Sequence, residues 1–134
     1  MLEKEIIQEN GFRNVRKNGQ IAGFQVGYRS CYYRSVWLSM SLGFDVTVDG
    51  EKFSRDQITV TVGGKTYTQE EMKKIGNVQW PNYEAALLTV AKPGGLKLGV
   101  HQIEIAWGHR TSYIPGGMDF GEGAPASRKL VLVY

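Results

Sequence analysis

Along residues 35–49, apolar and mostly polar side chains alternate without a break. The apolar positions are Val36, Leu38, Met40, Leu42, Phe44, Val46 and Val48. A period of two puts alternate side chains on opposite faces of a β-strand, so the segment predicts one long strand with one face in a core. The other face is left for water or a partner. Gly43 is a candidate bend between two sheets, and the unbroken parity predicts no one-residue bulge there.

Other segments repeat this strand pattern. Alternation recurs at residues 24–28, 58–62 and 96–107, and apolar runs occupy residues 85–91 and 130–134. Turn signals stand between them at Asn18-Gly19, Asp49-Gly50, Gly63-Gly64 and Pro93-Gly94-Gly95. Together these patterns predict an all-β protein: an antiparallel β-sandwich of jelly-roll or immunoglobulin-like type, forming a single domain over residues 1–134. A closed barrel is the alternative.

One short helix is expected after residue 68. Thr68 and Glu71 have the spacing of a capping box, and Met72 and Ile75 form a short apolar stripe. Glu70 is placed to pair with Lys74 one turn later. The helix is expected to be about two turns long.

Composition narrows the class of protein. The chain has 134 residues, 42% of them hydrophobic, which argues against intrinsic disorder and suits one compact domain. No apolar run approaches the about 18 residues of a membrane span, and the N-terminal residues lack an apolar signal core. Cys31 is the single cysteine, which excludes an internal disulfide. We therefore expect a reduced, cytoplasmic protein without a membrane partner.

Charge also argues against one class of partner. Sixteen Lys and Arg against thirteen Asp and Glu leave a net charge of +3. These basic residues are scattered along the chain, so we expect solvated faces and no nucleic-acid binding.

The candidate catalytic and metal-binding groups each have a simpler explanation. His101 shares a predicted strand face with two isoleucines, which is typical of a core histidine whose nitrogens are hydrogen-bonded. Neither His109 nor Cys31 has the partners that a metal site or a nucleophile needs. The Gly-x-Gly-x-x-Ala spacing at residues 121–126 lacks a preceding strand and a following helix. We expect no catalytic residue, no metal site and no cofactor in this chain.

Two clusters instead have the composition of docking surfaces. One precedes and enters the predicted long strand, and the other lies in residues 108–127, a Gly- and Pro-rich segment predicted to be a long loop near the C-terminus. Tyr, Trp and Arg dominate binding hot spots because they bury large areas and carry polar groups. The candidate interface residues are Tyr32, Tyr33, Arg34, Trp37, His109, Arg110, Tyr113, Met118 and Phe120. Ordinary core aromatics with surface arginines would produce the same composition.

Four segments resemble a known family. They are Tyr32-Tyr33-Arg34, Val48-Asp49-Gly50-Glu51, Gly94-Gly95-Leu96-Lys97-Leu98-Gly99-Val100-His101 and Arg110-Thr111-Ser112-Tyr113-Ile114-Pro115. In this order they are similar to the small (β) subunit of bacterial C-glycoside deglycosidases, over residues 11–134.

The resemblance implies a β-sandwich that pairs with a larger α subunit. That partner is expected to be a TIM barrel with a divalent metal, typically manganese, and to carry the catalytic residues. The complex is expected to cleave the carbon–carbon bond between a 3-keto sugar and an aromatic aglycone such as a flavonoid or isoflavonoid. In this reading the chain is a non-catalytic subunit that braces the barrel. The alternative is a stand-alone module that binds protein, or that binds carbohydrate with Trp37, Tyr32 and Tyr33 as a stacking platform.

Overall fold

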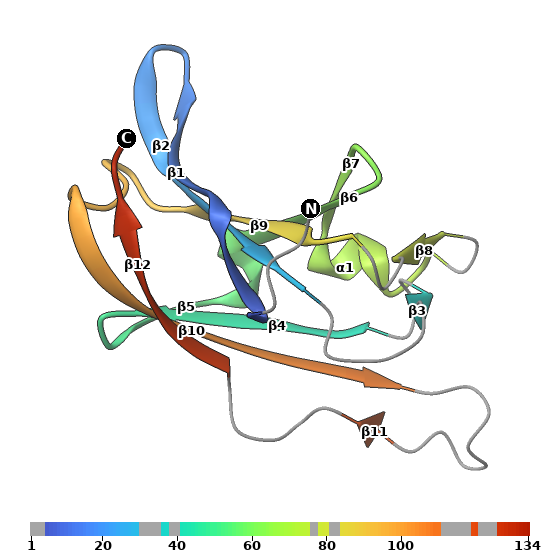
Figure 1. Cartoon of the computed structure of the whole chain (residues 1–134). Coiled ribbons are helices and arrows are strands. Elements are labelled where there is room, and N and C mark those ends of the chain that lie inside the picture. Colours follow the sequence, from blue (N-terminus) through green and yellow to red (C-terminus); the bar gives the residue numbers. More distant parts are fainter. Residues whose placement is uncertain are drawn as a thin grey trace.

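Two antiparallel sheets face each other across one hydrophobic core, which confirms the predicted all-β sandwich (Figure 1). The computed structural model describes residues 5–29, 36–37, 41–75, 78–80, 84–110, 119–120 and 126–134. The first sheet contains, in spatial order, β1 (Ile7–Lys17), β2 (Gln20–Tyr28), β9 (Ala86–Ala91), β6 (Ile58–Val62) and β7 (Lys65–Thr68).

The second sheet is organised around β10 (Gly99–Arg110). On one side of it lie β4 (Ser41–Val48) and then β5 (Glu51–Phe53). On its other side, β12 (Ala126–Leu132) pairs with its first half and β11 (Asp119–Phe120) pairs with its last residues. A separate two-stranded sheet joins β3 (Val36–Trp37) to β8 (Gln79–Trp80).

The predicted hairpin turns are confirmed. Asn18 and Gly19 have φ values of 54° and 78°, and Asp49 and Gly50 have φ values of 50° and 86°. Two consecutive positive φ angles are what a tight two-residue hairpin turn requires, and Asn-Gly and Asp-Gly are the pairs that adopt them at least cost. These turns join β1 to β2 and β4 to β5.

The alternating positions fill the core as predicted. In β4, Phe44, Val46 and Val48 are buried, and in β10 the same holds for Ile103 and Ile105. The two sheets also meet at one edge, where the Asn14 amide of β1 donates to the Tyr134 carbonyl beyond β12 over 3.0 Å.

The prediction of one continuous strand over residues 35–49 was wrong. The described parts of this segment form β3 and β4, in different sheets, and residues 38–40 lie outside the described residues. The expectation of no bulge was also wrong. Gly108 of β10 pairs with Gly43, but the next residue, His109, pairs with Ser41, so β4 carries one extra residue. Gly43 has a φ of +116°, a conformation that L side chains rarely adopt, and alternation of side-chain types does not register such a local change of backbone.

The predicted long loop over residues 108–127 is also corrected. β10 continues to Arg110, β11 pairs with its end, and β12 begins at Ala126. Backbone pairing therefore extends into a segment whose glycines and prolines suggested none. Residues 111–118 and 121–125 lie outside the described residues.

Within the described residues, two short helical turns stand between strands: η2 (Arg55–Gln57) and α1 (Gln69–Met72). The capping box of α1 is confirmed, with the Thr68 side chain accepting from the Glu71 amide. The helix is one turn rather than two, and Glu70 pairs with Lys73 at 3.3 Å rather than with Lys74. In the part of the chain that the structure describes, no helix is long and apolar enough to cross a membrane.

Candidate interaction surfaces

The predicted interface residues are only partly covered by the structure. Five of them lie outside the described residues: Tyr32, Tyr33, Arg34, Tyr113 and Met118. The other four are described by their strand pairing. Trp37 of β3 pairs with Gln79, and in the second sheet His109 pairs with Phe120 and Arg110 with Asp119.

These strands lie at one end of the sandwich, which we call the β11 end and define by β3, β8, β11 and the last residues of β10. Figure 1 shows all of them on the side where the β10 arrow ends, whereas the C-terminus and the β1–β2 hairpin lie at the opposite side. Two segments that are far apart in the sequence are thus brought to the same end of the molecule, as a shared docking surface requires.

Four aromatic side chains of the core support the β11 end. The Trp80 ring of β8 is 1% exposed, and its centroid lies 5.0 Å from that of Trp107, 5.9 Å from Phe44 and 6.2 Å from Tyr28. The Trp80 indole N–H donates to the Glu84 carbonyl over 2.6 Å. Because β8 is anchored in this way, its partner strand β3 is held against the sandwich.

A second surface was not predicted, and it consists of exposed apolar side chains near the C-terminus. We call it the C-terminal patch: Leu98, Val100, Val131, Val133 and Tyr134, with exposed fractions of 66%, 65%, 46%, 65% and 67%. Val100 and Val131 are direct neighbours across β10 and β12. The sequence did carry a signal for this patch. Residues 130–133 are all apolar, so that apolar side chains lie on both faces of the strand rather than on the core face alone.

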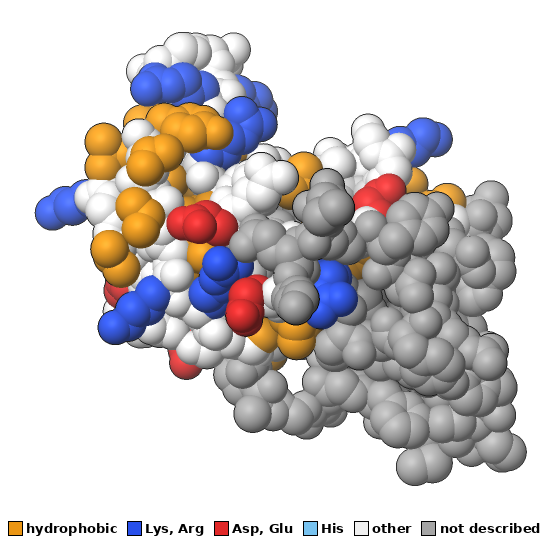
Figure 2. Space-filling model, in the orientation of Figure 1, with side chains coloured by type: hydrophobic (Ala, Val, Ile, Leu, Met, Phe, Trp, Pro, Cys, Tyr) orange, Lys and Arg blue, Asp and Glu red, His pale blue; other side chains and the backbone are white. Residues whose placement is uncertain are grey.

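A groove of about 910 Å³ adjoins the C-terminal patch. It is lined by Leu98, Val133 and Tyr134 of the patch together with Arg13, Asn14, Val15, Arg16, Ile21, Leu96 and Lys97. Three of these residues are basic and none is Asp or Glu. Figure 2 shows the hydrophobic side chains gathered on the left of the molecule, below a group of Lys and Arg side chains on the β1–β2 hairpin.

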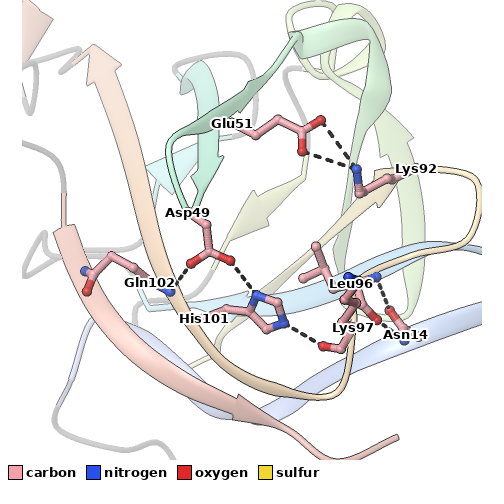
Figure 3. A network of polar contacts seen from close by, with 8 residues as sticks. All are labelled: Asn14, Asp49, Glu51, Lys92, Leu96, Lys97, His101 and Gln102. Carbon is pink, nitrogen blue, oxygen red and sulfur yellow. Dashed lines mark hydrogen bonds and ion pairs between the residues drawn. The ribbon is translucent and has the colours of Figure 1, made fainter.

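A polar network fixes the backbone beneath this groove (Figure 3). The Asn14 side chain accepts from the Leu96 amide over 2.9 Å and donates to the Leu96 carbonyl over 3.0 Å. Lys97, the residue after Leu96, is held by His101: its carbonyl oxygen lies 2.6 Å from the ring nitrogen Nε2. The segment that presents Lys97 and Leu98 is therefore held on two sides.

The other nitrogen of His101 completes the network. Its Nδ1 lies 2.6 Å from the Asp49 carboxylate, which also accepts from the Gln102 amide over 2.8 Å. Both partners of the ring are acceptors, so the protonated imidazole donates to both. Burial opposes that charge, but the hydrogen bonds to Lys97 and Asp49 outweigh it and raise the pKa of His101. The bonds from Gln102 and His101 lower the pKa of Asp49. The prediction of a buried histidine with satisfied nitrogens is confirmed.

A smaller pocket, of about 330 Å³, lies beside α1. It is lined by Gly43, Arg55, Asp56, Thr68, Gln69, Glu70, Met72 and Lys73. The buried Gln69 amide accepts from the Phe44 N–H over 2.7 Å and donates to the Phe44 carbonyl over 3.1 Å. Arg55 binds both carboxylate oxygens of Asp45 at 3.0 and 3.1 Å, which lowers the pKa of Asp45. The polar groups of this pocket therefore hold α1 and η2 against β4, a contact that sequence reasoning missed.

Among the described residues, no three or more His, Cys, Asp and Glu side chains are grouped so that they could hold a metal ion. Asp45, Asp49 and His101 have altered pKa values, and each is bonded to a partner within the chain.

Fold and surface together define a β-sandwich protein with an exposed apolar face of the kind used for protein contacts. The family model of the C-glycoside deglycosidase beta subunit matches residues 2–113. A curated relative from Eubacterium cellulosolvens, named C-glycoside deglycosidase beta subunit, is 41% identical over 115 residues, which are 85% of this chain and 78% of that protein. The chain belongs to the family of C-glycoside deglycosidase beta subunits, and a beta subunit implies a partner subunit.

Proposed function

We propose that the chain is the small, non-catalytic subunit of an enzyme that cleaves the carbon–carbon bond of 3-keto C-glycosides of the flavonoid or isoflavonoid type. The observation that carries the proposal is membership of the beta-subunit family over most of the chain. Its partner is a larger subunit with a TIM-barrel fold, which binds the C-glycoside substrate.

In this proposal the chain acts by holding the partner's active-site loops in place. The active site of a TIM barrel is built from loops at one end of the barrel. Bracing such loops favours the reactive geometry and excludes water, and small displacements of catalytic groups cost large factors in rate. The β11 end supports this role because it combines the predicted interface positions of β3, β10 and β11 on a rigid aromatic cluster.

The metal of the reaction, which we propose to be Mn²⁺, belongs to the larger subunit. The described residues of this chain do not fit a metal site, because no suitable group of ligands occurs among them. Both nitrogens of His101 are also occupied by Asp49 and Lys97.

Co-expression with the larger subunit tests the proposal. We expect the two chains to co-purify, the complex to cleave a 3-keto C-glycoside, and manganese to remain with the larger subunit after the chains are separated. A double variant, Arg110→Ala with Tyr113→Ala, should weaken the complex and lower turnover, whereas Lys65→Ala on the β6–β7 hairpin serves as a control that removes an exposed cation elsewhere.

Two outcomes contradict the proposal. One is turnover of the substrate by this chain alone at the rate of the complex. The other is a chain that does not bind the larger subunit, stays monomeric and has a higher thermal midpoint when sugar is added, as a stand-alone carbohydrate-binding module would.

A further inference from the structure

We infer that the C-terminal patch and its basic groove form a docking surface for the larger subunit, and that the docking segment of the larger subunit is apolar with acidic residues beside it. The inference rests on the proposed function and extends it, because it assigns a second contact surface and the chemistry of what binds there.

The distribution of apolar side chains on one face of the second sheet supports a binding role. Val100 and Val131 face solvent side by side. The next pair on the same face is polar, with Gln102 opposite Lys129, and Gln102 donates to the Ser127 hydroxyl over 2.6 Å. The apolar surface is therefore confined to one end of the face. Soluble proteins rarely expose a contiguous patch of this kind unless it binds something.

The charges beside the patch indicate which kind of partner it fits. Arg13, Arg16 and Lys97 line the groove, with no acidic side chain among the lining residues. Within the described part of the chain, neither Arg16 nor Lys97 takes part in an ion pair. A second copy of this chain docked on the same surface would bring basic groove against basic groove. An acidic partner instead gains complementary charge, which favours association and suppresses self-association.

The surface is also preorganised. Asn14 holds Leu96 by two hydrogen bonds, and His101 holds Lys97 by one (Figure 3). Leu98 follows directly and is two-thirds exposed, at 66%. Because the supporting backbone is fixed before binding, little ordering entropy remains to be lost when a partner covers it.

The patch is distinct from the surface at the β11 end. The C-terminus and the β11 end lie at opposite sides of the molecule in Figure 1. Substitutions in one surface can therefore be made without touching the other, and binding through each can be measured separately.

Isosteric variants give the sharpest test. Val100→Thr, Val131→Thr and Val133→Thr, combined in one protein, keep shape and β-propensity but remove apolar surface from exposed positions. Arg16→Glu reverses one charge of the groove, and Lys65→Glu on the exposed β6–β7 hairpin is the matched control. Circular dichroism and thermal midpoints verify that each variant is folded. Affinity for the purified larger subunit is measured by calorimetry at low and high salt, and the mass of each chain alone by light scattering.

We expect the triple Thr variant and Arg16→Glu each to weaken binding about tenfold or more, about 1.4 kcal/mol. The effect of Arg16→Glu should shrink at high salt because screening weakens the charge interaction. Lys65→Glu should bind like the wild type. Unchanged affinity in the patch variants overturns the inference while leaving the proposed function intact. The inference is also overturned if the wild-type chain alone is a dimer and the triple Thr variant is a monomer, because the patch then binds a second copy of this chain. A wild-type chain that never binds the larger subunit rejects both.

Discussion

The bonded state of His101 allows a direct test of the network under the groove. We predict that His101→Phe lowers the free energy of unfolding by about 2 kcal/mol at pH 5.5. His101 is 9% exposed, and phenylalanine replaces it with a ring of similar size, but the Lys97 carbonyl loses its donor and Asp49 keeps only the bond from the Gln102 amide. A hydrogen bond to a charged group is worth about 1.5–3 kcal/mol. Asp49 contributes the smaller part of the loss, because its side chain is 50% exposed and water can replace the imidazole.

The effect of this substitution should depend on pH with a definite sign. The pKa of His101 is raised in the folded protein above its ordinary value of 6.5, so its stabilising contribution is complete below 6.5 and is lost as pH rises through the folded pKa. Asp49 behaves oppositely. Its pKa is lowered from 3.8, so its contribution is present above 3.8 and is lost as pH falls through the folded pKa. The pair therefore stabilises the fold most between about pH 4 and pH 6.5.

Urea unfolding of the wild type and His101→Phe at pH 5.5 and pH 9 measures this difference. We expect the destabilisation above the folded pKa of His101 to be about half that at pH 5.5, because the neutral ring donates only one hydrogen bond. The chain has two histidines, so a His109→Gln variant leaves one imidazole whose pKa can be read by nuclear magnetic resonance. Equal destabilisation below and above the measured pKa of His101, or a His101 pKa at or below 6.5, would show that the protonated ring does not donate to both partners.

Four further substitutions, one of them a control, test other parts of the fold. Gln69→Leu should destabilise the protein by about 2–3 kcal/mol in urea unfolding, because it leaves a buried N–H and C=O of β4 unpaired; an unchanged midpoint would contradict this. Gly95→Ala should lower the free energy of unfolding by about 3 kcal/mol, since φ is +62° and the new Cβ would lie 2.6 Å from a methyl group of Ile21. Gly19→Ala is the control: the space around Gly19 is open, so this variant should lose only the backbone strain of about 1 kcal/mol. Asp45→Asn should cost about 0.5–1 kcal/mol at pH 7, because the bonded Arg55 side chain is 48% exposed. The Asp45 pKa is lowered from 3.8, so this cost should vanish as pH falls through the folded pKa, and a cost that does not change with pH would exclude the ion pair as its cause.

Local patterns in the chain were sufficient for part of this structure. Alternating residues in β2, β6 and β10 defined which side chains enter the core, because a strand has a period of two whatever its neighbours are. The turns at Asn18-Gly19 and Asp49-Gly50 and the cap at Thr68 followed from residue types whose backbone preferences act within two to four positions. His101 was recognised as a core histidine from its strand face alone.

Other features depended on contacts between distant residues. The bulge between Ser41 and Gly43 is seen only in the pairing of β4 with β10, and no pattern within residues 35–49 reports the position of another strand. Glycines and prolines in residues 108–127 suggested a loop, but pairing with a neighbouring strand gave β11 and the end of β10 their conformation. The Gln69 side-chain amide is hydrogen-bonded to the backbone of Phe44, 25 residues earlier in the chain.

The all-β class, the core faces, the tight turns and the family resemblance could all be recognised in the amino-acid sequence, because each depends on local preferences or on short motifs. The surfaces that the protein presents could be identified only after the two sheets were seen packed together. Leu98, Val133 and Arg16 come from three separate segments, and they border one groove because β1 packs against β12 and because the Asn14 and His101 hydrogen bonds hold the 96–98 segment in place. Surface chemistry of this kind arises from the packing of the two sheets, which no single segment encodes.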